Sequence, residues 1–339
     1  MITADTVLDV AGLTVTYSRG FGRPPLTAVS DVSFTVGRGE TVSIVGESGS
    51  GKTTIGSAIL GLQPIAQGSI RLNGIDIARL NPRERRPFRQ SLQAVFQDPY
   101  SSLDPTKTIG DAVGEPLRVA EPKLPADEVR RRVAGELGRV GLDPSLVHRF
   151  PAEFSGGQRQ RIAIARALIL KPAIVVCDEA VSALDVSVQA QVLNLLEALQ
   201  RDEGVSYIFI SHNMAAVRHI SDRIIVLYRG RIMEEGAAED VCDRPAHPYT
   251  RSLLASVPVP NVRVQRERRR LRGLTVAASR VGATQNGCPF APRCPFAAEV
   301  CVAAPPPLVE VGDGRRVACV RIDEIPEADE RAALELAGE

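Results

Sequence analysis

The stretch ETVSIVGESGSGKTTIGSAILGL, residues 40–62, decides the fold of this chain. It opens with ETVSIVG, a near-continuous apolar run that is typical of a buried strand. GESGSGKT, residues 46–53, then fits the pattern G-x-x-x-x-G-K-[ST], in which backbone N–H groups and a helix N-terminus cradle phosphate groups. The residues that follow are typical of a helix. A strand, a glycine-rich loop and a helix in this order predict a phosphate-binding α/β fold, and a merely flexible glycine loop is a poor alternative.

This loop predicts a set of nucleotide contacts. Lys52 is expected to reach the β- and γ-phosphates of a nucleotide, and Thr53 to hold Mg²⁺. The nucleotide-binding residues expected in this stretch are Gly46, Glu47, Ser48, Gly49, Ser50, Gly51, Lys52, Thr53 and Thr54.

Two acidic residues end a second apolar strand, IVVCDE at residues 174–179. Asp178 is expected to join the Mg²⁺ shell, and Glu179 to polarise the attacking water. Ordinary strand-to-loop polarity would explain such a pair alone, but the phosphate loop favours the functional interpretation. His212 ends the next apolar strand, where we expect it to sense or stabilise the γ-phosphate. A histidine that only occupies a loop is the alternative.

The first half of the chain combines strands with a helical insert. Residues 7–17 and 32–36 are β-branched and alternating, which predicts a strand-rich opening. Residues 105–170 predict a helical insert, and residues 82–91 are also expected to be mostly helical. One amphipathic stripe in the insert consists of Val129, Val133, Leu137 and Val140.

Three short apolar strands occupy the second half of the chain, at residues 173–179, 206–212 and 223–230. A helical pattern separates the first two. This alternation predicts a parallel sheet covered by helices.

The stretch EFSGGQRQRIAIARAL, residues 153–168, places two glycines at the start of a helix. Glycines let the backbone approach a phosphate closely, Ser155 adds a hydroxyl group, and the helix N-terminus adds partial positive charge. The stretch is therefore a second candidate phosphate site. Because one nucleotide needs only one phosphate loop, this site predicts a dimer with ATP held between two chains.

Composition limits the partners and the cellular location that the protein is expected to have. The chain has 339 residues, 44% of them hydrophobic, and a formal net charge of +1, which gives no general reason to expect a nucleic-acid partner. No stretch has the pattern of a signal peptide or a membrane-spanning helix. We therefore expect the chain to stay in the cytoplasm, at most docked on a membrane protein.

The motifs GESGSGKT, QDP, SGGQ, CDEAVSALD and SH occur in the order seen in ABC transporter ATPases, and the chain resembles that family. The resemblance implies a P-loop NTPase of the ABC type, with a parallel sheet core, an antiparallel β subdomain and a helical subdomain at about 105–170. It also implies that Tyr17 stacks on adenine, although a core-facing strand aromatic is the alternative. Gln97 would touch Mg²⁺ and relay to membrane subunits. The signature loop would be Ser155, Gly156, Gly157 and Gln158, with Asp185 contacting across the dimer and His212 as the switch histidine.

Residues 5–320 resemble, more narrowly, the ATPase subunits of dipeptide and oligopeptide importers. The stretches that carry this resemblance are FQDPYSSLDP, ALDVSVQAQVLNLL, HPYTRSLLASVP and GCPFAPRCPFAAEVC. The implied function is the ATP-hydrolysing motor subunit of a membrane importer for di- or oligopeptides. An exporter, an importer of another solute such as nickel, or a soluble ABC ATPase acting on nucleic acid or ribosomes are the alternatives.

The partners implied are a second ABC ATPase subunit, identical or related, and two membrane permease subunits. A solute-binding protein outside the cytoplasm is an indirect partner. Solute specificity is expected to lie in the permeases and the binding protein rather than in this chain.

The expected domains are an ATPase domain at 1–258, an arginine-rich linker at 259–287 and a cysteine module with a tail at 288–339. The linker run RERRRLR has no interleaved aromatic residues, so a solvated segment is favoured over a nucleic-acid or lipid patch.

Four of the six cysteines, Cys288, Cys294, Cys301 and Cys319, cluster in the proline-rich tail. Their first separations, of five and six residues, are wider than those of most structural zinc sites, which modestly favours a [4Fe-4S] cluster. Zn²⁺ and four unligated thiols are the alternatives. We expect this module to lie far from the phosphate loop and to act in structure or redox sensing. Cys177 and Cys242 are expected to be packing residues.

Overall fold

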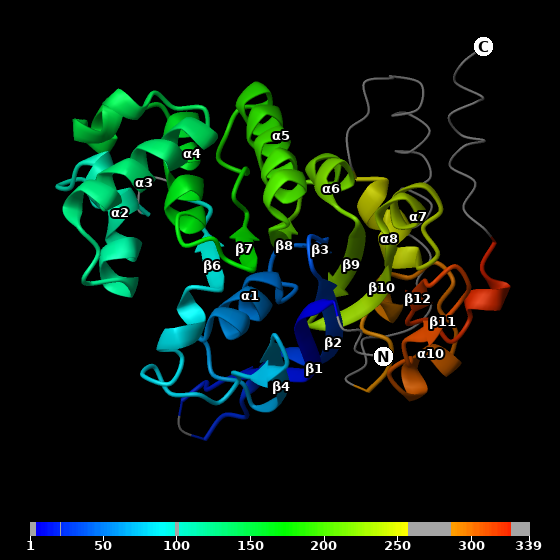
Figure 1. The fold of residues 1–339 in the computed structure, drawn as a ribbon. Helices are drawn as coiled ribbons and strands as arrows, with labels where there is room; N and C mark the ends of the chain where they lie inside the picture. The colour runs from blue at the N-terminus through cyan, green and yellow to red at the C-terminus, as the bar shows by residue number, and fades with distance from the viewer. Residues whose placement is uncertain (1–4, 21, 99–101, 257–285, 327–339) are drawn as a thin grey trace, which may run out of the picture. The chain divides into compact units, whose positions relative to one another are not determined.

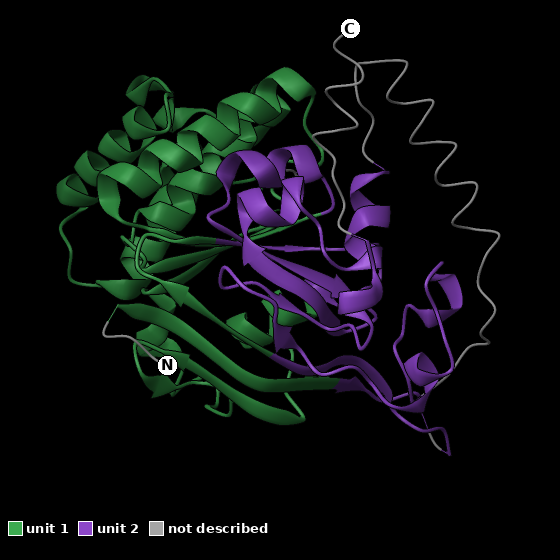
Figure 2. Cartoon of the chain, turned by 90° about the vertical axis from the view of Figure 1, so that its right-hand side faces the viewer, with its two compact units in different colours: residues 1–15, 33–41, 53–211 green, residues 16–32, 42–52, 212–339 purple. Residues whose placement is uncertain are grey.

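The structure is a computed structural model that describes residues 5–20, 22–98, 102–256 and 286–326. The chain forms two compact units (Figure 2). Unit 1 comprises residues 1–15, 33–41 and 53–211, and unit 2 comprises residues 16–32, 42–52 and 212–339. Residues 259–285 of the predicted arginine-rich linker lie outside the described residues.

Unit 1 contains strands of both orientations. Its antiparallel sheet has the order β2–β1–β4–β5, and residues 16–17 of β1 and 26–32 of β2 belong to unit 2. In a parallel arrangement β7 lies between β6 and β8, with Val176 opposite Ala94 on one side and Ile208 on the other. The strand bounds are β1 (Thr6–Tyr17), β2 (Leu26–Gly37), β4 (Gln67–Leu72), β5 (Ile75–Asp76), β6 (Leu92–Val95), β7 (Ile174–Asp178) and β8 (Ser206–Ser211).

The helices of unit 1 are α1 (Lys52–Leu60), of which Lys52 belongs to unit 2, α2 (Ile109–Ala120), α3 (Ala126–Arg139), α4 (Gly156–Leu168) and α5 (Val186–Glu203), with 3₁₀ turns η2 (Pro144–His148) and η3 (Pro151–Glu153). They lie only partly within the predicted insert at about residues 105–170, which contains α2, α3 and α4 but neither α1 nor α5. The predicted stripe is confirmed, because Val129, Val133, Leu137 and Val140 are all buried.

The prediction of a mostly helical segment at residues 82–91 is wrong. Only η1 (Arg86–Arg89) forms there, as a single 3₁₀ turn. Pro87 lacks a backbone N–H and disfavours helical geometry in the residue before it, so a longer α-helix is not supported.

Unit 2 contains a second set of strands and short helices. From residue 42 on, β3 pairs in parallel with β9, β9 pairs antiparallel with β10, and β12 lies between β10 and β11. The strands are β3 (Thr41–Val45), β9 (Arg223–Tyr228), β10 (Arg231–Ala237), β11 (Val309–Glu310) and β12 (Arg316–Val317), and the helices are α6 (Met214–Ile220), α7 (Ala238–Asp243), α8 (Pro248–Leu254), α10 (Val300–Ala303) and the 3₁₀ turns η4 (Ala291–Arg293) and η5 (Ile322–Glu324) (Figure 1).

The cysteine-rich tail is thereby attached to the sheet of unit 2. Val317 lies opposite Glu234 in the β10–β12 pair, and the Ala318 N–H donates to the Met233 carbonyl at 2.9 Å. Parallel and antiparallel sheets with intervening helices confirm the predicted α/β class. No helix among the described residues is both long and apolar enough to cross a membrane.

Candidate functional site

The predicted phosphate loop lies in unit 2 and directly follows β3. Gly46 has φ +153°, and a Cβ atom there would lie 2.1 Å from the Leu227 carbonyl oxygen. Only glycine therefore fits this position without moving backbone. The Lys52 ammonium group donates to the carbonyl oxygens of Gly46 at 2.9 Å and Glu47 at 3.0 Å. The lysine side chain is thus held along the loop that it is predicted to serve.

Thr53 and Asp178 meet in unit 1, although 125 residues separate them. Thr53 is the second residue of α1, and Asp178 is the last residue of β7. The Thr53 hydroxyl donates to Asp178 Oδ1 at 3.2 Å. A hydroxyl and a carboxylate oxygen at this separation are hard oxygen ligands of the kind that Mg²⁺ prefers, so the residues present fit the ion. Gln97 follows β6 with an exposed side chain, and Thr54 is half-buried on α1.

Glu179 has a left-handed backbone, with φ +50°. Its N–H donates to the Ile210 carbonyl of β8 at 2.9 Å, and its carbonyl accepts from the Ser182 N–H and hydroxyl at 3.0 and 2.9 Å. A non-glycine residue in this region costs about 1–3 kcal/mol, so these bonds hold a strained conformation. The strain coincides with the residue predicted to polarise water.

Two helix N-termini carry the predicted signature and dimer residues in unit 1. Ser155 caps α4, because its hydroxyl accepts from the Gln158 N–H at 3.3 Å while Gln158 Oε1 accepts from the Ser155 N–H at 3.0 Å. Asp185 caps α5, accepting from the Ser187 hydroxyl at 2.6 Å and the Val188 N–H at 3.0 Å. These bonds lower the pKa of Asp185.

Gly157 brings these two helix starts together. A Cβ on Gly157 would lie 2.3 Å from Val188 Cγ1, so the close approach of α4 to α5 requires a glycine here. A Cβ on Gly156 would meet only Leu184 Cδ2, at 3.9 Å. The first glycine is therefore open toward its surroundings, and the second is needed for packing.

The other predicted site residues occupy element ends. Tyr17 ends β1 with 37% of its surface exposed, which contradicts the alternative of a core-facing aromatic. His212 directly follows β8, and its side chain is exposed.

Two residues beside the loop were missed by the sequence analysis. The Glu47 N–H donates to the Tyr249 hydroxyl at 3.0 Å, and the Glu47 carboxylate pairs with both terminal nitrogens of Arg293 at 2.9 Å. Tyr249 belongs to the stretch HPYTRSLLASVP, but no spacing rule connects it with residue 47. Arg293 lies in the cysteine-rich tail, so the expectation that this module is far from the phosphate loop is wrong.

The four tail cysteines line one small cavity of about 20 Å³ in unit 2. Burial raises the pKa of the Cys294 thiol to about 12 and also raises the pKa of Cys288 and Cys319. Among the described residues, which include all four, no group of three or more Cys, His, Asp or Glu side chains is arranged to hold a metal ion. The predicted [4Fe-4S] cluster is therefore not supported. Cys177 and Cys242 are buried, as predicted.

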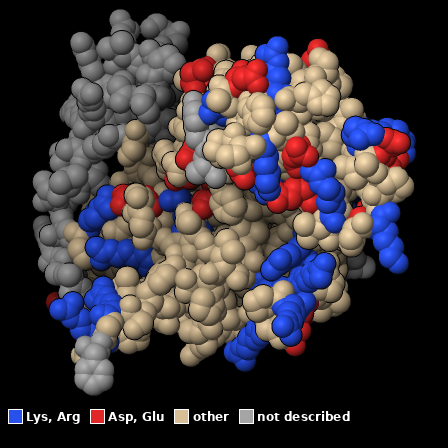
Figure 3. Space-filling model, turned by 90° about the vertical axis from the view of Figure 1, so that its left-hand side faces the viewer, with Lys and Arg blue, Asp and Glu red and all other residues tan. Residues whose placement is uncertain are grey.

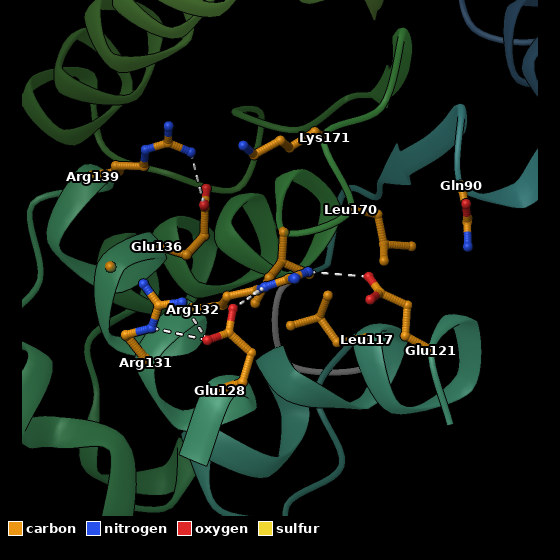
Figure 4. A pocket seen from close by; sticks show the side chains of 12 residues that line it. Gln90, Leu117, Glu121, Glu128, Arg131, Arg132, Glu136, Arg139, Leu170 and Lys171 are labelled. Atoms are coloured by element: carbon orange, nitrogen blue, oxygen red, sulfur yellow. Dashed lines mark hydrogen bonds and ion pairs between the residues drawn. The ribbon is translucent and has the colours of Figure 1, made fainter. Parts of the chain in front are cut away.

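A cavity of about 540 Å³ elsewhere in unit 1 is lined by charged residues of α3, by Leu117 of α2 and the following Glu121, and by Gln90 and residues 169–171 (Figure 4). Arg139 donates to the buried Glu136 at 3.1 Å, and burial raises the pKa of Glu136. Basic and acidic side chains also lie beside one another on the face of the molecule in Figure 3. None of the predicted nucleotide residues lines this cavity.

Comparisons with known proteins identify the family of the chain. The sequence profile of the ABC transporter family matches residues 29–182, and that of the oligopeptide/dipeptide transporter C-terminal region matches residues 233–301. The chain is 44% identical over 327 residues to the oligopeptide transport ATP-binding protein OppF of Escherichia coli (strain K12), covering 94% of this chain and 96% of that protein. It is 46% identical over 320 residues to a putative peptide import ATP-binding protein of Brucella ovis, covering 94% and 99%.

Solved structures show the same fold. CbiO1 from Clostridium perfringens, part of the ABC transporter complex cbiONQ, superposes with a TM-score of 0.63 at 29% identity, over 70% of this chain and 90% of that one. A dimeric ATP-binding cassette in a post-hydrolysis state, bound to ADP and phosphate, gives 0.61 at 29% identity, over 68% and 98%.

The chain belongs to the ATP-binding subunits of ABC transporters. Within that family it is of the oligopeptide and dipeptide transporter type, and it is an ATPase.

Proposed function

We propose that this chain hydrolyses ATP between its phosphate loop and the signature residues of a second ATPase subunit, and thereby drives import of di- or oligopeptides through two permease subunits. The observation that carries the proposal is the Thr53–Asp178 bond, which joins the phosphate-loop threonine to the carboxylate at the end of β7. The similarity to OppF supports the peptide solute. The chain would act at the cytoplasmic face of the membrane, with a solute-binding protein as an indirect partner.

The residues take the following parts. The loop backbone and Lys52 bind the phosphates, and Tyr17 stacks on the adenine. Mg²⁺ bound by Thr53, Gln97 and Asp178 would neutralise charge on the phosphates. Glu179 polarises the attacking water, and His212 contacts the γ-phosphate. Ser155, Gly156, Gly157, Gln158 and Asp185 face the nucleotide of the partner subunit.

The test is Glu179→Gln, which removes the water-orienting carboxylate and keeps the side-chain shape. We expect ATP binding to persist and the hydrolysis rate to fall by about 10²- to 10⁴-fold. Glu128→Gln, which makes the same chemical change in an exposed ion pair of α3, is the matched control and should hydrolyse ATP normally. A Glu179→Gln rate close to that of the parent would contradict the assignment.

As a separate proposal, the tail thiols move together to hold a [4Fe-4S] cluster, with Zn²⁺ as the alternative ion, because their arrangement among the described residues does not itself form a metal site. The support is that Cys288, Cys294, Cys301 and Cys319 all line one cavity. Such a cluster would cross-link the tail, which has few large buried side chains. Anaerobically purified protein should then be brown, with about four irons per chain, and Cys294→Ser should lose the colour. Colourless protein with about one zinc per chain would reject the cluster.

A further inference from the structure

Glu47, the second residue of the phosphate loop, is held from three sides within unit 2. Its N–H donates to the Tyr249 hydroxyl at 3.0 Å, its carbonyl accepts from the Lys52 ammonium at 3.0 Å, and its carboxylate pairs with Arg293 at 2.9 Å on both oxygens. The last contact has the fork geometry in which arginine fixes a carboxylate in orientation as well as position. Arg293 therefore restricts the side chain of a residue whose neighbours are predicted to bind phosphate.

The Arg293 side chain is itself positioned by aromatic residues. Its guanidinium carbon lies 5.9 Å from the centre of the Tyr228 ring and 5.7 Å from that of Phe290. These rings pack on each other and on Tyr249, with centroid separations of 5.5, 5.3 and 4.5 Å. Tyr249 and Phe290 are almost fully buried. The guanidinium group thus lies against a rigid aromatic cluster, which lowers the entropy lost when it pairs with Glu47.

The backbone that carries Arg293 is set by the cysteine-bearing turn. The Cys288 N–H donates to the Cys301 carbonyl at 2.7 Å, and the Ala291 N–H donates to the Cys288 carbonyl at 3.0 Å. The Arg293 N–H then closes η4 by donating to the Phe290 carbonyl at 2.9 Å. The conformation of the tail therefore decides where the guanidinium group lies.

We infer that Arg293 is a positioning residue for nucleotide binding, through which the cysteine-rich tail braces the phosphate loop at Glu47. This inference rests on the proposed role of the loop in nucleotide binding, and it adds a residue outside the loop that sets the affinity for the nucleotide. A preorganised loop presents its N–H groups to phosphate without first losing conformational freedom. Removing Arg293 increases the conformational entropy that the loop loses on binding, and so weakens ATP binding. The Glu179 carboxylate, which acts in hydrolysis, is not changed.

The test measures the ATP dissociation constant, KM and kcat for full-length variants. The Glu47 and Arg293 side chains are 44% and 48% exposed, and ion pairs with such exposure contribute modestly to stability and binding. Arg293→Ala should therefore weaken ATP binding by about three- to fivefold and raise KM equally, with kcat unchanged. Arg293→Lys should recover part of the affinity, because a point charge keeps the ion pair but not the fork.

The Glu47→Gln variant distinguishes positioning of the loop by Arg293 from a direct electrostatic attraction between Arg293 and phosphate. If Arg293 acted only as a positive charge near phosphate, removal of the Glu47 carboxylate would tighten ATP binding. The brace predicts the opposite sign, a weakening similar to that in Arg293→Ala. The charge-swapped double variant, Glu47→Arg with Arg293→Glu, should bind more tightly than the sum of its single changes allows, because it restores the pair.

Arg321→Ala is the matched control. Arg321 pairs with Glu324 and donates to the Phe296 carbonyl inside the tail, so it tests for general damage to the module. It should bind ATP as the parent does, and thermal melts should confirm that each variant is folded. Unchanged affinity in Arg293→Ala, or tighter binding in Glu47→Gln, overturns the inference. If Lys52→Ala also binds ATP normally, the loop is not the nucleotide site, and the proposed function fails together with the brace.

Discussion

Gly46 occupies a position that only glycine can fill, because of both its backbone conformation and its close neighbours. Its φ of +153° lies in a region that L-residues avoid, and the Leu227 carbonyl occupies the space where a Cβ would lie. Gly49, three residues later in the same loop, also has a positive φ, of +77°, but no atom lies within 4 Å of its would-be Cβ. A side chain at position 49 would therefore meet backbone strain alone, whereas one at position 46 would also collide with a neighbouring atom.

This difference gives a prediction at the residue scale. Gly46→Ala should unfold the loop and abolish ATP binding, because a Cβ 2.1 Å from a carbonyl oxygen forces the backbone to move. Gly49→Ala should lower the free energy of unfolding by only about 1–2 kcal/mol, the usual cost of a left-handed non-glycine residue. Thermal unfolding and ATP titration of both variants provide the measurement. Equal behaviour of the two would show that the loop is more adaptable than this geometry implies.

At the scale of elements, the sequence predicts structure well where a functional residue directly follows an apolar strand or directly begins a helix. Asp178 follows four apolar residues, and the structure places it at the end of β7, opposite Ile210 of β8. Likewise, the Ser-Gly-Gly start of α4 and the Asp185 start of α5 both form the caps that their residue types favour. Local propensity and hydrophobic pattern suffice for such features.

Contacts between segments that are far apart in the chain could not be predicted from the sequence. Glu47 and Arg293 are 246 residues apart, and nothing in the spacing of either stretch indicates that the pair forms. The tail joins the sheet of unit 2 through β12, a two-residue strand that is too short to produce an alternating pattern. Proximity of the cysteine module to the phosphate loop therefore depends on tertiary packing, which periodicity does not encode.

At the scale of the whole molecule, the proposed assembly is a dimer that closes on ATP. The signature residues can serve a partner's nucleotide only if their surface is open, and Gly156 meets this condition. Gly156→Asp should place a negative charge against the partner's phosphates and prevent ATP-dependent dimerisation. Because the nearest atom to the new Cβ is 3.9 Å away, the monomer should still fold, and ATP should still bind at Lys52.

Light scattering with ATP, on the Glu179→Gln background that slows hydrolysis, measures this outcome. Gly156→Ala is the control, since it adds a Cβ without charge and should still dimerise. A dimer that forms equally well with aspartate at this position would reject the shared site. Gly157→Ala is unsuitable as a control, because its Cβ would collide with Val188.

The pairing of Glu47 with Arg293 also constrains how such chains diverge. Position 47 is one of the variable positions of the phosphate-loop pattern, so nucleotide chemistry alone leaves its residue type free. The fork contact restricts that freedom, because the carboxylate at 47 and the guanidinium at 293 each supply the charge that the other pairs with. Lineages that lose the cysteine-rich tail would thereby release position 47 to drift, and the two positions would change in step across the family.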